Sequence, residues 1–408
     1  MNNLGIRERV LVVGVDTPIG LTLVRELGGK GLQVYGVARS ERGVGLFSRW
    51  LKEGFIIQGD RSSQLSDIID IVGRNNIGTV MAVSEGDLLW LDDQKHKFQG
   101  VHFLIPSRTQ LQSVLDKSHV YSLAKDVGVP LPRMFEPASP IDARKANFRF
   151  PVVVKWSDPN KILPILERNG IAFEKFEYAY DHSDLECILR RYEGIGYFPV
   201  VQEFCPGYGL GQMFLLHKGE VVLFFQHRRV HEWPPEGGFS TLCEPISSSE
   251  HSELRSKSLD LLKALNWEGV AMVEYRYDPL SKQSALMEIN GRFWGSLPLA
   301  NSAGALFAWE WYRVKVKGER ATLPSVYRTG FRCAYMVPEL KRLFCILFTR
   351  DRIQNRELKF SSFSEIFSVL CIWLNPQSRY YVFSILDPKP FMADLMFMFR
   401  DKVLRKFL

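Results

Sequence analysis

The densest group of chemically capable side chains lies between residues 285 and 296, where the chain reads ALMEINGRFWGS. Glu288, Asn290 and Arg292 stand at every second position of this segment. Side chains two apart on a β-strand point to the same face, so a carboxylate, an amide and a guanidinium would share one surface. Hard oxygen ligands suit Mg²⁺, and the planar guanidinium suits phosphoryl oxygens. The spacing therefore indicates a site for a divalent cation with phosphates.

The segment just upstream supplies a second carboxylate. Residues 270–277 read VAMVEYRY, which alternates like a strand and ends at Asp278-Pro279. Glu274 on this strand could bind the same metal ion as Glu288. A Glu-x-Asn-x-Arg pattern taken alone is more often a surface hairpin whose charges are merely solvated. The order of the preceding motifs favours the metal site.

Strands and helices alternate over residues 8–110. Val10 to Val15 form a continuous apolar run, which is typical of a strand buried on both faces of a parallel sheet. A turn at Gly14–Gly20 opens a helix that ends near Gly31. Further strands are predicted at residues 32–38, 79–84 and 101–106. This rhythm predicts a small doubly wound domain.

The next hundred residues mix helices with antiparallel strands. The pattern predicts a helix from Asp116 to Gly128, which stops at the sequence GVPLP. A Lys218-Gly219 turn joins two apolar segments as a hairpin. The other elements are expected to be strands at 150–155, 173–180 and 197–204 and a short helix at 184–192.

Taken in this order, the motifs resemble the ATP-grasp superfamily of ATP-dependent carboxylate ligases, which includes D-alanine–D-alanine ligase, biotin carboxylase and carbamoyl-phosphate synthetase. The resemblance covers residues 8–312 and implies an α/β and α+β fold. It implies a Rossmann-like pre-ATP-grasp domain at 1–112 and an ATP-grasp domain at 113–312, whose two lobes meet near residue 200. A small, basic and aromatic-rich C-terminal region follows at 313–408.

The resemblance also implies roles for individual residues. Asp116-Lys117 is similar to the family's Asp-Lys helix, and FPVVVK at 150–155 to its Pro-Val-Val-Val-Lys strand, so Lys117 and Lys155 would contact the ATP phosphates. The hinge strand VVQEFCPG would surround the adenine. The implied site consists of Lys117, Lys155, Gln202, Glu203, Phe204 and Cys205 for ATP; Glu274, Glu288 and Asn290 for the metal; and Arg292 for the transferred phosphoryl group.

A further segment points to the substrate. HRRVHE at 227–232, followed by PPEGGFS, resembles the His-x-Arg and Gly-Gly-x-Ser pattern of ATP-grasp carboxylate–amine ligases. A flexible glycine pair behind arginines suits a loop over an anionic substrate, and Arg228 is predicted to bind it. The alternative is a turn with a structural arginine.

The sequence departs from the family pattern at two places. Gly291 stands where many relatives have proline. The loop at 156–162 replaces the glycine-rich phosphate lid of several relatives, so the lid could involve Asn160, Lys161 or residues as far as Gly170.

The implied function is that of an ATP-dependent ligase, which activates a carboxylate as an acyl phosphate and joins it to an amine. ATP and Mg²⁺, with Mn²⁺ as a substitute, would be its cofactors. A nicotinamide-dependent oxidoreductase is the main rival, because a glycine turn, Arg39 and Tyr121-x-x-x-Lys125 echo that class. A non-catalytic nucleotide-binding scaffold is the other.

Composition sets the remaining expectations. Hydrophobic residues at 46% and charged residues at 24% describe an ordinary soluble protein of 408 residues. Six irregularly spaced cysteines favour reduced thiols and a cytoplasmic location. The N-terminal apolar run stops at Asp16, so no signal peptide is expected. The longest apolar stretch, Ile366 to Leu374, is far shorter than the roughly 20 residues that span a bilayer.

The net charge of +7 is unevenly distributed. Residues 311–408 contain 18 Lys and Arg against 8 Asp and Glu. This basic, aromatic-rich region could touch an anionic membrane surface, or it could be the solvated face of an accessory domain. No nucleic-acid-binding module is recognisable. A homo-oligomer is compatible with the sequence.

Overall fold

A computed structural model describes residues 8–145, 147–321 and 326–407. The N-terminal part is a five-stranded sheet in the order β3-β2-β1-β4-β5, and every paired strand in it is parallel. Its strands are β1 (Arg9–Val13), β2 (Gln33–Ala38), β3 (Leu51–Ile56), β4 (Thr79–Ala82) and β5 (His102–Leu104). Its helices are α2 (Pro18–Gly29), α3 (Arg61–Arg74), α4 (Glu85–Gln94) and α5 (Arg108–Leu115). The mixed α/β fold expected from the sequence is confirmed.

A small antiparallel sheet follows, in the order β6-β9-β7-β8. Its strands are β6 (Met134–Phe135), β7 (Val152–Lys155), β8 (Glu177–Ala179) and β9 (Val200–Glu203), with helices α6 (Lys117–Asp126), α7 (Pro159–Arg168) and α8 (His182–Arg190). Val152, Val154 and Val201 pack into a separate core with Leu185 and Leu189 of α8. Because side chains alternate along a strand, Val153 and Lys155 occupy the other face.

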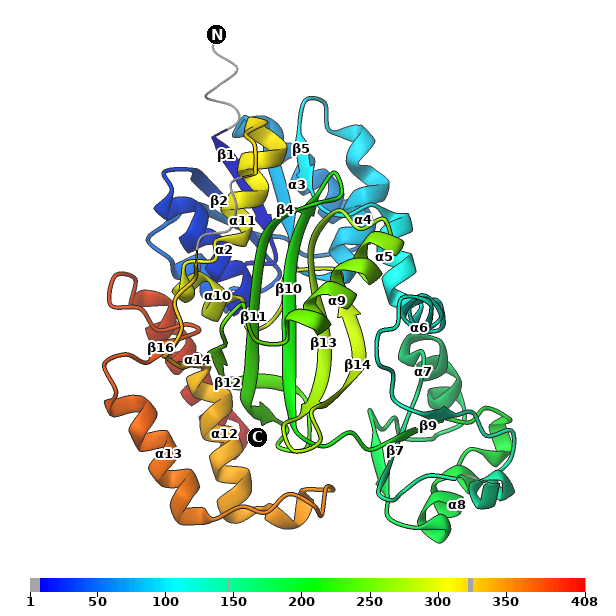
Figure 1. Cartoon of the computed structure of the whole chain (residues 1–408). Coiled ribbons are helices and arrows are strands. Elements are labelled where there is room, and N and C mark those ends of the chain that lie inside the picture. Colours follow the sequence, from blue (N-terminus) through cyan, green and yellow to red (C-terminus); the bar gives the residue numbers. More distant parts are fainter. Residues whose placement is uncertain (1–7, 146, 322–325, 408) are drawn as a thin grey trace.

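The largest sheet has the order β14-β13-β10-β11-β12-β15-β16 and stands at the centre of the molecule (Figure 1). Its strands are β10 (Tyr208–His217), β11 (Glu220–Trp233), β12 (Phe239–Pro245), β13 (Gly269–Asp278), β14 (Gln283–Asn290), β15 (Cys333–Ala334) and β16 (Arg379–Tyr380). The predicted β10–β11 hairpin forms, and Lys218 and Gly219 have φ values of +52° and +80°. These angles suit the twist of a two-residue hairpin turn.

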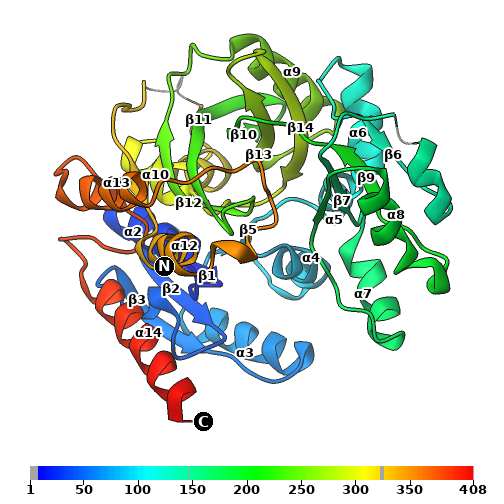
Figure 2. The same ribbon diagram turned by 90° about the horizontal axis from the view of Figure 1, so that it is seen from below.

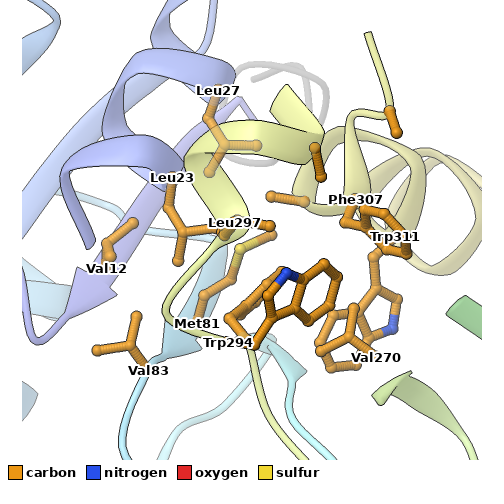
Figure 3. Close-up of a cluster of buried hydrophobic side chains, with 14 of the residues drawn as sticks. Val12, Leu23, Leu27, Met81, Val83, Val270, Trp294, Leu297, Phe307 and Trp311 are labelled. Carbon is orange, nitrogen blue, oxygen red and sulfur yellow. The ribbon is translucent and has the colours of Figure 1, made fainter. Parts of the chain in front are cut away.

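Helices pack against the large sheet and tie it to the N-terminal sheet. The Ser258 hydroxyl of α9 (Ser252–Ala264) donates a hydrogen bond to Gln212 Oε1 on β10, at 2.7 Å. α10 (Leu297–Ala303) and α11 (Phe307–Tyr312) lie against α2. Figure 3 shows the shared core, in which Val12, Leu23 and Met81 meet Trp294 and Phe307. The segment that follows β14 is thereby fixed between the two sheets.

The C-terminal region is built into the body of the protein. It adds β15 and β16 to the large sheet and contributes α12 (Met336–Phe348), α13 (Ser362–Leu374) and α14 (Lys389–Phe407). The buried Asp387 accepts hydrogen bonds from Arg25 Nε at 2.9 Å and from Ser48 Oγ at 2.7 Å. Seen from below, α14 lies beside the N-terminal sheet (Figure 2). This region is therefore more than the small extension predicted from the sequence.

Candidate active site

Two carboxylates face each other across the β13–β14 pair. Glu274 stands directly opposite Glu288, and a register shift follows between Glu274 and Tyr275. The side-chain amide of Asn290 donates to Glu288 Oε1 at 2.9 Å. The three residues that the sequence assigns to a metal thus lie together. Among the described residues, no group of three or more His, Cys, Asp or Glu side chains could hold a metal alone. A cation here would need further oxygens, such as those of phosphates.

The two carboxylates titrate differently. Burial raises the pKa of Glu274, and the neighbouring Glu288 adds to this effect, although Arg229 opposes it. Burial also acts to raise the pKa of Glu288, but the Asn290 hydrogen bond and the positive charges of Lys117, Arg229 and Arg292 outweigh it and lower the pKa. Glu288 is therefore held as an anion, and a bound cation would favour the ionised form of Glu274 as well.

Arg229, which the sequence analysis did not select, reaches these carboxylates. Its Nη2 donates to Glu274 Oε2 at 2.5 Å, and its Nη1 donates to Glu232 Oε1 at 3.1 Å and to the Gly238 carbonyl at 3.0 Å. The side chain is largely buried. Gly209 gives it space, because a Cβ there would lie 2.8 Å from Arg229 Cδ.

Gly211 makes room for a second large side chain in the same way. A Cβ on Gly211 would lie 2.5 Å from His227 Nε2. Gly209 and Gly211 share one face of β10, and His227 and Arg229 share the matching face of β11. Two glycines at alternate positions of a strand, Gly209 and Gly211, are the signal in the sequence that could have found these residues.

Arg228, the residue predicted to bind the substrate, lies away from these carboxylates. It is exposed, pairs with Glu244 on β12, and lies with its guanidinium 5.8 Å from the Tyr208 ring centre. Side chains alternate along β11, so Arg228 points to the opposite face from Arg229. Arg332 donates to the same Glu244, at 2.9 Å. The structure therefore brings Arg229, and not Arg228, to the carboxylates.

Two lysines approach the carboxylates from other elements. Lys117 is the first residue of α6, whose N-cap Asp116 accepts from the His119 amide at 3.1 Å. Lys155 ends β7. Burial lowers the pKa of Lys155 to about 8, and the charge of Lys117 adds to this shift, although Glu288 and Glu274 oppose it. These four charged groups therefore share one electrostatic neighbourhood.

Main-chain contacts fix α6 against β14. The Tyr121 hydroxyl donates to the Met287 carbonyl at 3.2 Å, and the Leu286 amide donates to the Pro130 carbonyl at 2.8 Å. Tyr121 therefore has a structural role at the start of the site. Lys125 is exposed, and Arg39 pairs with the buried Asp87. Tyr121 and Arg39, two of the features that resemble a nicotinamide-dependent enzyme, thus have other partners.

Lys155 gives the site a testable pH dependence. Above a pH of about 8 this side chain loses its proton and its charge. We expect the affinity for ATP, measured by calorimetry with excess Mg²⁺, to fall as the pH rises from 7.5 to 9.5. Lys155→Arg, which stays charged, should remove most of that fall. An affinity that stays constant up to pH 9.5 in the unaltered protein would contradict this role.

The four residues that the sequence assigns to the adenine, Gln202 to Cys205, have different surroundings in the structure. Gln202 is buried, its Nε2 lies 3.9 Å from Met287 Sδ, and its Oε1 has no hydrogen-bond partner within the described part of the chain. Its register with Val153 puts it on the Lys155 face of β7 and β9. An unpaired acceptor beside apolar side chains suits the amino group of an adenine.

The residues after Gln202 are placed differently. Glu203 accepts hydrogen bonds from the Arg133 amide at 2.7 Å and from Arg133 Nε at 3.1 Å. Its carboxylate is therefore paired with Arg133, the residue just before β6. Phe204 lies against the Tyr178 ring, with centroids 6.1 Å apart. Burial raises the pKa of the Cys205 thiol to about 11, so it stays neutral.

Arg292 connects the site to the N-terminal sheet. Its Nε donates to Oε1 of Glu85, the first residue of α4, at 3.0 Å. The preceding Gly291 has no room for a side chain, because a Cβ there would lie 2.5 Å from the Trp267 ring. This packing explains why glycine stands at a position where proline was the family expectation.

The predicted lid segment is partly helical. α7 begins at Pro159, and the side chain of Asn160 lies outside the described residues. Lys161 is exposed, and its main-chain amide donates to Asp158 Oδ1 at 3.2 Å. The prediction that Asn160 and Lys161 form a phosphate lid stays a prediction.

Comparison with known proteins identifies a family resemblance in the segment that carries β13 and β14. Residues 243–314 match the family model of the carbamoyl-phosphate synthase L chain ATP-binding domain. That segment includes all three candidate metal ligands. A search of curated proteins found no sequence match.

Solved structures share the fold over most of the chain. N5-carboxyaminoimidazole synthetase from Staphylococcus aureus is 12% identical, with a TM-score of 0.58 and 79% of each chain covered. L-amino acid ligase from Bacillus licheniformis is 15% identical, with a TM-score of 0.55, and the match covers 76% of this chain and 74% of that one. Biotin carboxylase from Campylobacter jejuni is 15% identical, with a TM-score of 0.59 and coverages of 80% and 74%. These matches show that the chain shares the fold of these enzymes and that residues 243–314 resemble the ATP-binding domain of the carbamoyl-phosphate synthase L chain, in agreement with the ATP-grasp resemblance of the sequence.

Proposed function

We propose that this protein is an ATP-dependent ligase that activates a small carboxylate as an acyl phosphate and joins it to an amine. The observation that carries the proposal is the group formed by Glu274, Glu288 and Asn290 with Lys117 and Lys155. Oxygen-bearing side chains of the large sheet thus share an electrostatic neighbourhood with one lysine from α6 and one from β7. The name of one similar structure, an L-amino acid ligase, agrees with joining a carboxylate to an amine.

The residues present fit a magnesium ion. Glu274 and Glu288 would each supply a carboxylate oxygen, and Asn290 an amide oxygen. Mg²⁺ usually binds through one or two carboxylates together with substrate phosphates, and Mn²⁺ accepts similar ligands. The bound cation would draw charge from the phosphoryl oxygens. Three protein ligands leave the remaining coordination positions of the cation for phosphate oxygens and water.

The nucleotide would lie between β9 and β14. The free Oε1 of Gln202 would accept a hydrogen bond from the adenine amino group, and Val153 and Met287 would line the ring. Lys117 and Lys155 would bind the phosphates as point charges. Phe204 and the neutral Cys205 would border the base, while Glu203 would support the strand through Arg133.

The chemistry follows from the positive groups. A substrate carboxylate oxygen attacks the γ-phosphorus of ATP, the bond to the β-phosphate breaks, and ADP leaves. Arg292 and the two lysines neutralise the charge that develops on the transferred group. The amine then attacks the acyl carbon, and inorganic phosphate departs with the oxygen of the broken carbon–oxygen bond. Closing the small sheet over the site would keep water from the acyl phosphate.

Arg229 replaces Arg228 as the candidate for substrate binding. Its guanidinium already spans Glu274, Glu232 and the Gly238 carbonyl, so it stands beside the metal carboxylates. Gly237 has φ of +140°, and a Cβ on Gly238 would lie 2.1 Å from the Trp233 carbonyl oxygen. The glycine pair therefore lets this loop turn back toward Arg229.

The phosphate role of the lysines has a direct test. Lys117→Ala and Lys155→Ala should each weaken ATP binding and lower the rate of ADP formation, each by about tenfold or more. Lys125→Ala, on the exposed side of the same α6 helix, is the matched control and should leave both unchanged. If both site variants bind ATP as tightly as the control does, the nucleotide lies elsewhere.

A further inference from the structure

The helix α13 exposes an unusual number of large apolar side chains. Its sequence SFSEIFSVLCIWL contains one residue with a formal charge, Glu365, which accepts from Arg342 Nη1 of α12 at 2.7 Å. Only Val369 and Ile372 are buried. Phe363 and Leu374 are 81% and 80% exposed. A helix that is apolar around most of its circumference normally packs against something else.

The neighbouring helix α12 adds to this surface. Phe344 and Phe348 are exposed one turn apart, with ring centroids separated by 4.8 Å. The two helices pack together, and both views place α13 at the edge of the molecule (Figures 1 and 2). We call the exposed set the α12–α13 apolar surface, which consists of Phe344, Phe348, Phe363, Ile366, Phe367, Leu370, Trp373 and Leu374. Exposed apolar patches of this kind mark interaction sites on monomeric proteins.

Positive charge accompanies the apolar surface. The segment between the two helices carries Arg350, Arg352, Arg356 and Lys359, all exposed, against the exposed Asp351 and Glu357. Residues 311–408 as a whole have a surplus of ten positive charges. A second copy docking on the same surface about a two-fold axis would set these like charges against one another. An anionic partner avoids that cost.

We propose that the α12–α13 apolar surface lies on an anionic lipid bilayer. Phenylalanine and tryptophan on short helices, flanked by basic residues, suit the interface between headgroups and acyl chains. α13 has 13 residues and is about 20 Å long at 1.5 Å per residue, so it can lie on a bilayer but not cross one. In the described part of the chain, no helix is long and apolar enough to span a membrane.

The proposal is tested with the full-length protein and vesicles of phosphatidylcholine, with or without 30 mol% phosphatidylglycerol. The protein should float with the anionic vesicles at low salt, and the bound fraction should fall at high salt. The triple variant Phe363→Ser/Phe367→Ser/Leu374→Ser should have an affinity for the anionic vesicles that is lower by about tenfold or more. Serine removes apolar area without adding charge. Arg350→Gln/Arg352→Gln should bind more weakly and lose salt sensitivity.

The control is Leu280→Ser, which removes a 93% exposed leucine from the β13–β14 turn. This variant should bind the vesicles as the unaltered protein does. The melting temperature of every variant should stay within a few degrees of that of the unaltered protein. Three results would overturn the proposal. The first is no flotation at any salt concentration, and the second is equal binding to neutral and anionic vesicles. The third is a dimer in light scattering that the triple variant converts to a monomer, since a second copy would then cover the surface.

Discussion

Glu288→Gln should lower Mg²⁺-dependent ATP turnover by about 100-fold or more while the protein stays folded. Glutamine keeps the size of the side chain and can still face Asn290, but it removes the anion that Lys117, Arg229 and Arg292 stabilise. Loss of a charged metal ligand is worth several kcal/mol in the transition state, and about 3 kcal/mol corresponds to two orders of magnitude in rate. Asn290→Ala should act in the same direction.

The measurement is ADP formation at saturating ATP across a range of Mg²⁺ concentrations. Glu253→Gln, an exposed carboxylate at the start of α9, serves as the control and should behave as the unaltered protein does. If high Mg²⁺ partly restores Glu288→Gln, the loss lies in metal binding. Near-normal ADP formation by both Glu288→Gln and Asn290→Ala at low Mg²⁺ would refute the metal assignment.

Arg229 and its neighbour Arg228 provide a second large effect with an internal control. Arg229→Lys keeps the charge but loses the fork that holds Glu274, Glu232 and the Gly238 carbonyl together. Substrate-stimulated ADP formation should fall by about tenfold or more, roughly 1.4 kcal/mol. Arg228→Lys should stay within about twofold, because Arg228 is exposed, pairs with Glu244 on β12 and lies on the opposite face of β11 from Arg229.

Removing the positive charge of Arg229 altogether tests its contribution to the stability of the fold. Arg229→Gln leaves the largely buried Glu274 carboxylate without its cation, which should cost roughly 3–5 kcal/mol of stability, while Glu232 keeps Arg276 as a partner. The melting temperature should fall accordingly, and less so at low pH, where the raised pKa of Glu274 lets it become neutral. A pattern in which Arg228 variants lose activity and Arg229 variants do not would return the substrate site to Arg228.

The strand positions of the candidate metal ligands could be predicted because their evidence is local. Glu288, Asn290 and Arg292 stand two apart, and the alternation of β13 places Glu274 on the facing strand. The same local logic found β1, the β10–β11 hairpin and α6. No distant contact is needed to read such periodicities.

The remaining features depend on contacts between distant segments. Arg228 and Arg229 are adjacent, and only the registers of β10 and β12 against β11 decide which one faces Glu274. Glu203 pairs with Arg133, which is 70 positions away in the sequence. Arg292 pairs with Glu85, which is 207 positions away. The short strands β15 and β16 have too few residues to show any periodicity. Tertiary pairing fixed all of these.

The most direct test of the proposed function follows oxygen from the substrate to phosphate. A panel of carboxylate and amine pairs is first screened for ADP formation, and the most active carboxylate is then labelled with ¹⁸O. If the carboxylate attacks ATP and the amine displaces the phosphate, one ¹⁸O should appear in inorganic phosphate for each ADP released, and Glu288→Gln should abolish the transfer. ATP binding without ADP formation across the whole panel, or phosphate released without ¹⁸O, would contradict ligation through an acyl phosphate.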